Sequence, residues 1–310
     1  MEITLAAVQA EIRPEAYERA EAFIARVDEL VAMAVEGIKA GPRIVALPEL
    51  FALPLLLWLE APPEVRAARS LTEAAWAWAR ALGLVRSLTK GPWGVHHLRA
   101  QQVWEVWSEA VRSAAKKHRA YVFAGTSLLP RLDEEPAKGV YATSTAVYNY
   151  GFWATPRGRL LGRPEKLRLT PDERRGLVRP GRWADQVIAT RLGRIATLVC
   201  LDAFHEALVE RADAAGAWLL VQPSANARTW AGPWSADPDR VEGEVWLERG
   251  LKYLLKDREH LAYGLNPMLT GSLYELGFEG RANVAAPGET LALSAAPTGD
   301  GLARDTVVRP

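Results

Sequence analysis

The sequence has very few residues that could form disulfides or bind metals. Cys200 is the only cysteine among 310 residues, so no disulfide can form within the chain. The five histidines are scattered, and no Cys or His pair has the spacing of a zinc site. We therefore expect a cytoplasmic protein from a reducing compartment, with no metal and no other cofactor. A lone cysteine is usually a small buried hydrophobic residue, so by itself it indicates no chemistry.

The chain also lacks an excess of charge and a long apolar run. Its 38 Lys and Arg residues and 37 Asp and Glu residues leave a formal net charge of +1, so no overall field attracts nucleic acid or an anionic membrane. The most apolar run, residues 53–59, is less than half of the roughly 20 residues that cross a bilayer. Residues 1–15 lack the basic head and cleavage site of a signal peptide. We expect a small-molecule substrate, no nucleic acid and no membrane.

Several well-known enzyme motifs are missing. Gly125-Thr126-Ser127 lacks the second glycine of the G-x-S-x-G serine hydrolase motif. His205-Glu206 is not followed by the second histidine of a zinc protease, because Val209 occupies that position. No glycine-rich phosphate-binding motif occurs, which leaves nucleotide binding without support.

The remaining composition is that of a globular protein, with 49% hydrophobic and 24% charged residues. Residues 3–9 form a nearly continuous apolar run, which favours a strand buried on both faces. Apolar spacing predicts a helix over residues 15–39, and residues 43–47 predict a second buried strand. This strand–helix–strand opening is typical of an α/β fold. Because no linker or repeat interrupts the chain, we expect one domain over residues 1–310, with helices covering both outer faces.

The same patterns continue along the chain. We expect helices over residues 102–118, 203–215 and 242–257. We expect strands over residues 120–125, 140–150, 159–162, 187–190, 194–199, 217–222, 261–265 and 281–285.

Residues 51–100 interrupt this alternation with prolines and helix-favouring Ala, Leu and Arg, and we interpret them as an inserted helical segment. Half of the twelve tryptophans lie in or just after it, namely Trp58, Trp76, Trp78, Trp93, Trp104 and Trp107. They could line a substrate pocket, form a lid or build a subunit interface. Alternatively they are the local core of an added helical layer.

Cys200 ends the predicted strand over residues 194–199 and precedes a predicted helix. Ligands gather at the carboxyl ends of strands in open α/β sheets. A helix start lowers a thiol pKa through its dipole and its unpaired N–H groups. The position therefore favours a reactive thiolate.

Glu49 and Lys166 also lie at or just past predicted strand ends. Apolar neighbours raise the pKa of a carboxyl such as Glu49 toward the range useful for proton transfer, although a helix N-cap or surface charge is the alternative. A lysine at the position of Lys166 is usually a solvated charge. Together, however, a thiol, a carboxylate and a cation are the groups needed to attack a carbonyl, move its protons and stabilise the oxyanion.

The motifs around these residues, in this order, resemble the nitrilase (carbon–nitrogen hydrolase) superfamily. They are L-P-E-L at residues 47–50, E-K-L-R-L-T-P-D-E at 165–173 and G-R-I-A-T-L-V-C-L-D at 193–202. Later matches are L-L-V-Q-P-S-A at 219–225, Y-G-L-N at 263–266 and F-E-G-R-A-N-V at 278–284. The resemblance covers most of the chain outside residues 51–100. It implies a four-layer αββα sandwich and a homodimer or larger homo-oligomer.

The resemblance also implies roles for individual residues. Cys200 is the nucleophile, Glu49 the general base and acid, and Lys166 the oxyanion stabiliser, helped by the backbone N–H of Leu201. The family's second glutamate maps onto Glu173. Glu165 is the competing candidate, but in an extended segment it would point away from Lys166. Four residues in or beside the motifs are candidate substrate contacts: Phe51, Asp202, His205 and Ser224.

Two departures bear on the substrate. The interval between Glu49 and Lys166 is longer than is typical of the family, and the excess falls in the tryptophan-rich segment. The cysteine lies in a C-x-D sequence, which resembles amidases, whereas nitrilases have C-W-E. Hydrolysis of a linear amide is therefore expected first. The alternatives are an N-carbamoyl amino acid hydrolase, with Arg163, Arg168, Arg174 or Arg175 binding the carboxylate, a nitrilase, an amide-forming acyltransferase, or a catalytically silent interaction scaffold.

Scarce Asn, Gln, Cys and Met, together with many Arg and Pro residues, suggest a thermophilic source, although biased base composition would give the same profile.

Overall fold

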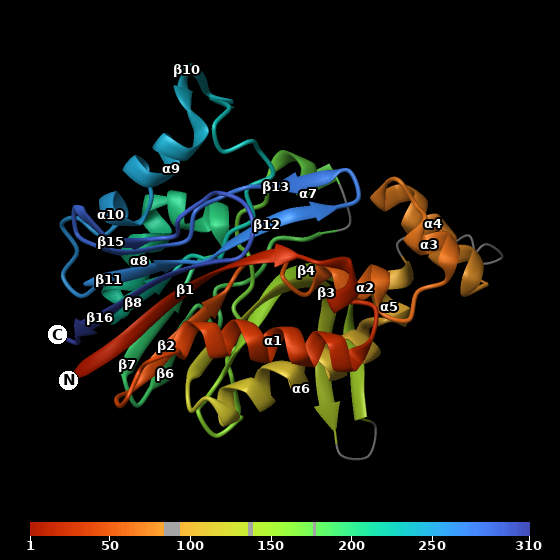
Figure 1. The fold of residues 1–310 in the computed structure, drawn as a ribbon, viewed down its shortest axis with the longest axis horizontal. Coiled ribbons are helices and arrows are strands. Elements are labelled where there is room, and N and C mark those ends of the chain that lie inside the picture. Colours follow the sequence, from red (N-terminus) through yellow and green to blue (C-terminus); the bar gives the residue numbers. More distant parts are fainter. Residues whose placement is uncertain (84–93, 136–138, 176–177) are drawn as a thin grey trace.

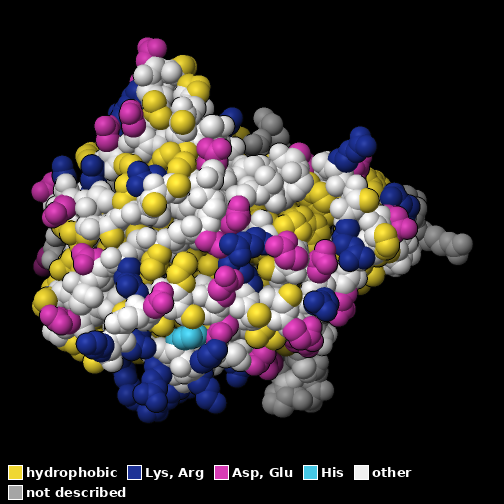
Figure 2. Space-filling model, in the orientation of Figure 1, with side chains coloured by type: hydrophobic (Ala, Val, Ile, Leu, Met, Phe, Trp, Pro, Cys, Tyr) yellow, Lys and Arg dark blue, Asp and Glu magenta, His cyan; other side chains and the backbone are white. Residues whose placement is uncertain are grey.

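The computed structural model describes residues 1–83, 94–135, 139–175 and 178–310. Two β-sheets pack face to face and helices cover the outer side of each sheet, with both chain termini near the same end (Figure 1). The predicted α/β fold and four-layer αββα sandwich are confirmed. The side of the surface drawn in Figure 2 carries basic and acidic side chains interspersed, in keeping with the nearly neutral charge balance.

The first sheet is built around β1 (Glu2–Ile12), which is buried along nearly its whole length. In the described chain the strand order is β13-β12-β1-β2-β3-β4-β5, and β16 also pairs with β1. β1 runs parallel to β2 and β12 and antiparallel to β16. The bounds are β2 (Arg43–Leu47), β3 (Tyr121–Glu135), β4 (Gly139–Ala154), β5 (Leu160–Leu161), β12 (Met268–Leu273), β13 (Leu276–Phe278) and β16 (Gly301–Val308).

The second sheet has the order β15-β14-β11-β8-β7-β6 among the described residues. Its middle strands β7, β8 and β11 run parallel to one another. The bounds are β6 (Val187–Thr190), β7 (Gly193–Thr197), β8 (Ala217–Val221), β11 (Tyr263–Asn266), β14 (Asn283–Ala286) and β15 (Glu289–Leu293).

Apolar side chains from both sheets form the layer between them. Phe123 and Trp153 of the first sheet lie in one buried cluster with Ile195 and Leu219 of the second. The Trp153 Nε1 donates a hydrogen bond of 3.0 Å to the Thr197 Oγ1, which links the two sheets directly. This apolar layer fixes how the carboxyl ends of β2 and β7 face each other.

Helices complete the outer layers. α1 (Ala20–Val35) and α6 (Ala100–Lys117) pack on the first sheet, and α8 (Glu206–Ala214) and α10 (Leu251–Leu254) pack on the second. The hairpin of β9 (Pro233–Trp234) and β10 (Asp237–Val241), followed by α9 (Glu242–Arg249), projects from the body as an arm (Figure 1).

The segment predicted to be helical consists, where described, of α2 (Leu53–Trp58), α3 (Pro63–Arg66), α4 (Leu71–Ala81) and α5 (Val95–Leu98). Residues 84–93, with Trp93, lie outside the described residues. Trp58, Trp78, Trp104 and Trp107 are buried in the core on this side of the first sheet, whereas Trp76 is 43% exposed. For these four tryptophans the structure favours a core role.

Three predicted helices have different limits. The helix expected over residues 15–39 is a short 3-10 turn, η1 (Pro14–Ala16), followed by α1. The one expected over residues 203–215 is a 3-10 helix, η4 (Cys200–Phe204), followed by α8. The one expected over residues 242–257 divides at Gly250, where a Cβ atom would come within 2.2 Å of the Trp246 carbonyl oxygen. Glycine permits this close approach of the backbone.

Candidate active site

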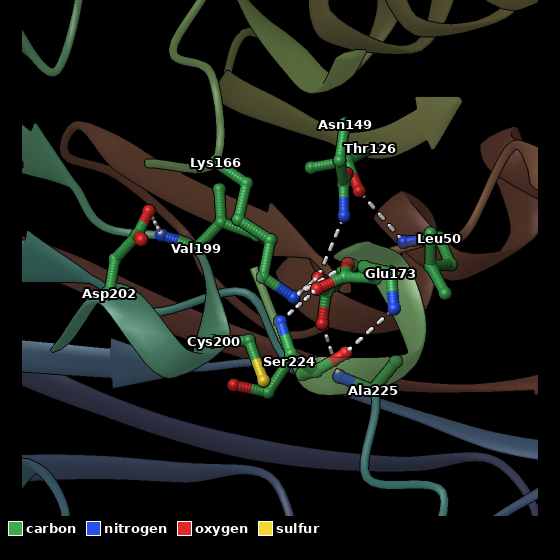
Figure 3. A network of polar contacts seen from close by, with 12 residues as sticks. Leu50, Thr126, Asn149, Lys166, Glu173, Val199, Cys200, Asp202, Ser224 and Ala225 are labelled. Atoms are coloured by element: carbon green, nitrogen blue, oxygen red, sulfur yellow. Dashed lines mark hydrogen bonds and ion pairs between the residues drawn. The ribbon is translucent and has the colours of Figure 1, made fainter. Parts of the chain in front are cut away.

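Glu49, Lys166 and Cys200 come from separate segments and meet in one buried cluster. Figure 3 shows Lys166 and Cys200 of this cluster, with Asn149, Glu173 and Ala225 around them. Glu49 follows β2 of the first sheet by two residues, and Cys200 follows β7 of the second by three. Lys166 follows β5, and its backbone N–H bonds to the Asn149 carbonyl oxygen of β4 at 2.8 Å. The sheets thus bring together a carboxylate, an amine and a thiol that lie far apart in the sequence.

The Glu49 carboxylate is held on both of its oxygens. Its Oε1 accepts hydrogen bonds of 2.8 Å from the Lys166 Nζ and 2.8 Å from the Asn149 Nδ2. Its Oε2 accepts the backbone N–H of Ala225 at 3.1 Å. Burial raises the Glu49 pKa, and the charge of Glu173 adds to the rise, while Lys166 and a hydrogen bond with the Cys200 thiol oppose it. The result is a fixed carboxylate with increased affinity for a proton.

Lys166 is only 2% exposed and lies between two carboxylates. Besides the bond to Glu49, its Nζ donates to the Glu173 Oε1 at 2.9 Å. Burial alone would lower the Lys166 pKa, but the negative groups around it, Glu49 above all, raise it. Lys166 therefore stays a cation in the resting site.

Glu173, and not Glu165, is the second glutamate beside Lys166. Its Oε2 accepts the Thr170 backbone N–H at 2.7 Å, and the Thr170 Oγ1 accepts the Glu173 N–H at 3.3 Å. This reciprocal pair is a capping box at the start of α7 (Pro171–Arg175), and it aims the carboxylate at Lys166. Glu165 turns away and binds the Arg131 guanidinium through both oxygens.

Cys200 has a constrained backbone and a protonated thiol. Its φ of +50° lies in the left-handed region, which non-glycine residues rarely adopt, and its N–H bonds to the Pro223 carbonyl oxygen at 2.9 Å. Burial raises the thiol pKa and the Glu49 charge raises it further, against the lowering effect of Lys166. The prediction of a thiolate at a helix start is therefore wrong for the resting site, because burial outweighs the short η4 helix. Deprotonation requires a base, and Glu49, whose charge raises the thiol pKa, is the carboxylate of this cluster that can serve as one.

Two predicted substrate contacts, Phe51 and Ser224, are buried in the structure. Phe51 is fully buried, with its ring 5.6 Å from the Phe23 ring and 6.3 Å from the Tyr17 ring. Ser224 is also fully buried, and its Oγ bonds to the Gln222 carbonyl oxygen and to the Asn266 Nδ2. Both side chains are enclosed by protein in the structure, and their contact with substrate stays a prediction.

The remaining predicted residues differ in position. Asp202 is wholly buried and accepts hydrogen bonds from backbone N–H groups, and its contact with substrate stays a prediction. His205 is exposed at the start of α8, where partial burial and the charges of Arg168 and Arg174 lower its pKa. Leu201 is the second residue of η4, directly after the nucleophile, and its role stays a prediction.

The sequence did not reveal Asn149 and Ala225, which orient Glu49, or Thr126, whose Oγ1 accepts the Leu50 N–H at 2.8 Å. Asn149 had one signal, because it is a polar residue between two tyrosines in the strand expected over residues 140–150. The Ala225 contribution is a backbone group, which no side-chain pattern can indicate.

Within the described part of the chain, no three His, Cys, Asp or Glu side chains gather so as to hold a metal ion. In the same residues, no helix is long and apolar enough to cross a membrane.

Several solved structures share this fold at low sequence identity. That of Saccharomyces cerevisiae Nit3, a member of branch 10 of the nitrilase superfamily, is 17% identical with a TM-score of 0.62, over 98% of this chain and 89% of that one. A mutant of the amidase from Nesterenkonia sp. AN1, with acrylamide added at its active-site cysteine, is 19% identical with a TM-score of 0.62, over 100% and 93%. A carbon–nitrogen hydrolase from Helicobacter pylori G27 is 15% identical with a TM-score of 0.65, over 98% and 89%.

A comparison with curated proteins finds no match. The model of the carbon–nitrogen hydrolase family matches residues 4–240, a span that includes Glu49, Lys166 and Cys200. The match extends over most of the chain, and the protein therefore belongs to the carbon–nitrogen hydrolase family of the nitrilase superfamily, as its motifs predict.

Proposed function

We propose that this protein hydrolyses a small linear amide in the cytoplasm through a thioester on Cys200. The observation that carries the proposal is the buried cluster itself, in which the Glu49 Oε1 accepts the Lys166 Nζ at 2.8 Å and the charges of Glu49 and Lys166 both act on the pKa of the Cys200 thiol. One carboxylate thus contacts the cation that stabilises negative charge and lies in the same buried cluster as the thiol whose proton must be removed. A reducing compartment keeps the single thiol available for attack.

In the first half of the reaction, Glu49 takes the thiol proton while the sulfur attacks the amide carbonyl carbon. The raised pKa values of both groups suit this step, since thiol and carboxylate then compete for one proton in a buried site. Negative charge develops on the carbonyl oxygen, and Lys166 and the Leu201 N–H stabilise it. Glu49 gives its proton to the departing nitrogen, the C–N bond breaks, and ammonia or an amine leaves.

In the second half, Glu49 takes a proton from water, and the resulting hydroxide attacks the thioester carbonyl. The C–S bond breaks, the carboxylic acid leaves, and Glu49 returns the proton to the sulfur. Glu173 keeps Lys166 in place through both halves.

Two features support an amide as substrate. The sequence Cys200-Leu201-Asp202 resembles the C-x-D of amidases. Structures of the Nesterenkonia sp. AN1 amidase with the same fold were obtained in complex with butyramide and with acrylamide. The alternative of an N-carbamoyl amino acid hydrolase loses one of the four arginines that could bind the substrate carboxylate. Arg163 bonds instead to the Leu132 carbonyl oxygen and lies over the Trp104 ring. The side chain of Arg175 lies outside the described residues.

Ammonia release from a panel of short aliphatic and aromatic amides tests the proposal, with matching nitriles and N-carbamoyl amino acids alongside. We expect turnover of at least one amide, and its loss in Cys200→Ala and Glu49→Gln. The control is Lys117→Ala, which removes an exposed amine paired with Asp28 and should leave activity unchanged. An amide-hydrolysing Cys200→Ala variant, or a protein that acts on nitriles alone, contradicts the proposal.

A further inference from the structure

Asp202 is a wholly buried carboxylate that binds only backbone groups in the described chain. Its Oδ1 accepts the N–H of Arg168 at 2.6 Å and that of Leu167 at 3.1 Å. Its Oδ2 accepts the same Leu167 N–H at 3.0 Å. The Oδ2 also accepts the Val199 N–H at 3.3 Å (Figure 3). Three backbone donors therefore converge on one side chain.

These donors belong to the two segments that carry the reacting groups. Val199 immediately precedes Cys200, and Leu167 immediately follows Lys166. The backbone hydrogen bonds of Cys200 and Lys166 do not join the two segments. The Cys200 N–H donates to the Pro223 carbonyl oxygen, the Lys166 N–H donates to the Asn149 carbonyl oxygen, and the Lys166 carbonyl oxygen accepts the Gly181 N–H. In the described chain, the Asp202 carboxylate accepts the hydrogen bonds that join the Cys200 segment to the Lys166 segment.

We propose that Asp202 is a positioning residue, which fixes the distance between the attacking sulfur and the amine that stabilises the oxyanion. The inference rests on the proposed function, since it assigns a task within that reaction. Lys166 must meet an oxygen bonded to the very carbon that Cys200 attacks, so a relative shift of the two segments weakens transition-state stabilisation. A misplacement of about 1 Å in such a site costs a factor of about 100 in rate.

The surroundings of Asp202 explain why an isosteric amide cannot replace it. Burial raises its pKa to about 7, while the hydrogen bonds from Leu167 and Arg168, the Lys166 charge and the Val199 N–H hold it down. The ionised form thus depends on these donors. An asparagine has the same shape, but its NH₂ group would face at least one N–H donor, which leaves that donor unpaired in a buried place.

Asp213 offers a matched control. On α8, its carboxylate accepts the N–H groups of Glu259, His260 and Leu261 at 2.8 to 2.9 Å. Like Asp202, it is therefore a carboxylate that accepts hydrogen bonds from three backbone N–H groups. It binds the loop before β11, however, and neither of the two catalytic segments.

The test compares kcat and KM of the parent, Asp202→Asn and Asp213→Asn on the amide that the parent hydrolyses best, with thermal unfolding to show that each variant folds. We expect Asp202→Asn to lower kcat by about 10- to 100-fold with KM within about threefold, and Asp213→Asn to keep kcat within about twofold. If Asp202→Asn does not fold, Asp202→Ser, which retains one acceptor oxygen, takes its place under the same criteria.

Two results overturn the inference. One is an Asp202 variant with kcat within about twofold of the parent. The other is an equal loss of kcat in Asp213→Asn, which would mean that removing any carboxylate bound to backbone N–H groups lowers activity. A parent that hydrolyses no amide defeats the proposed function and this inference with it, whereas an active parent with an unaffected Asp202 variant defeats this inference alone.

Discussion

Single residues in this site are defined more by burial than by their ordinary chemistry. Cys200 and Glu49 both have raised pKa values because water is excluded from them, and Glu49 is the base in the same cluster to which the thiol can lose its proton. Residue types at strand ends indicated Glu49, Lys166 and Cys200, and the family resemblance was needed to add Glu173 to the group. They were not enough to predict that Asp202 and Ser224 are wholly buried, since burial at a motif becomes visible only when the sheets are assembled.

The two neighbouring glutamates provide a prediction about Lys166. Glu173→Gln removes a negative charge that binds the Lys166 Nζ at 2.9 Å, and we expect kcat to fall by about tenfold, the effect of one charge-assisted hydrogen bond. Glu165→Gln is the control, because Glu165 adjoins Lys166 in sequence but binds Arg131. Its kcat should stay within about threefold of the parent in steady-state assays. Equal losses in the two variants would remove the distinction between these glutamates.

The raised pKa of Asp202 predicts how stability depends on pH. Between its ordinary value of 3.8 and about 7, the unfolded chain has released this proton while the folded chain still holds it. Folding then binds a proton, so this residue contributes stability at low pH that is lost as pH rises through the window. Denaturant unfolding gives the free energy of unfolding of the parent and of Asp202→Asn at each pH. The difference between the two free energies should fall by at most about 4 kcal/mol from pH 4 to pH 7. A pH-independent difference would contradict this prediction.

At the scale of elements, the strands were easier to predict near the site than away from it. The apolar runs of β2, β7 and β8 are buried on both faces and stand out in the sequence. β12, β13, β15 and β16 were missed. They are short or carry alternating polar residues, and Gly271 with its φ of +84° lies within β12. β16 forms because β1 is its antiparallel partner. The two strands lie at opposite ends of the sequence, so no local pattern indicates their pairing.

The Tyr274 hydroxyl attaches the helical segment to the β12–β13 hairpin, and its removal is a testable change. Its hydroxyl accepts the Trp58 Nε1 at 2.8 Å and donates to the Val65 carbonyl oxygen at 3.0 Å. Tyr274→Phe should destabilise α2 and α3 by about 1–3 kcal/mol, since the buried Trp58 N–H loses its partner. Hydrogen exchange of their amides should become faster. Tyr263→Phe, whose lost bond to Val308 is exposed, should leave that exchange unchanged, and an equal effect of both would contradict the attachment.

At the scale of the molecule, alternating strands and helices predicted an α/β fold, and the family resemblance supplied the two-sheet arrangement that the structure confirms. The apolar patterns could not show which strands share a sheet, because both faces of the central strands are buried and neighbours are chosen by long-range pairing. The homodimer or larger assembly and the thermophilic source stay predictions. Light scattering of the purified protein tests the former.

The layer between the sheets should dominate the global stability. Trp153→Ala removes a fully buried indole that packs on Phe123 and bonds to Thr197, and we expect a loss of about 3–5 kcal/mol in guanidinium unfolding. Trp76→Ala, at a position that is 43% exposed, should change stability by less than about 0.5 kcal/mol. Similar losses from both substitutions would contradict the assignment of the core.

The central claim is that Cys200 forms a thioester, and mass spectrometry of the intact protein, quenched during amide turnover, tests it most directly. The account predicts an increase in mass equal to the acyl group of the amide less one hydrogen. The increase should map to the peptide containing Cys200 and be absent from Cys200→Ala. Two results would contradict the claim. One is turnover without an acyl adduct when the thioester is released slowly enough to accumulate. The other is an adduct on any other residue.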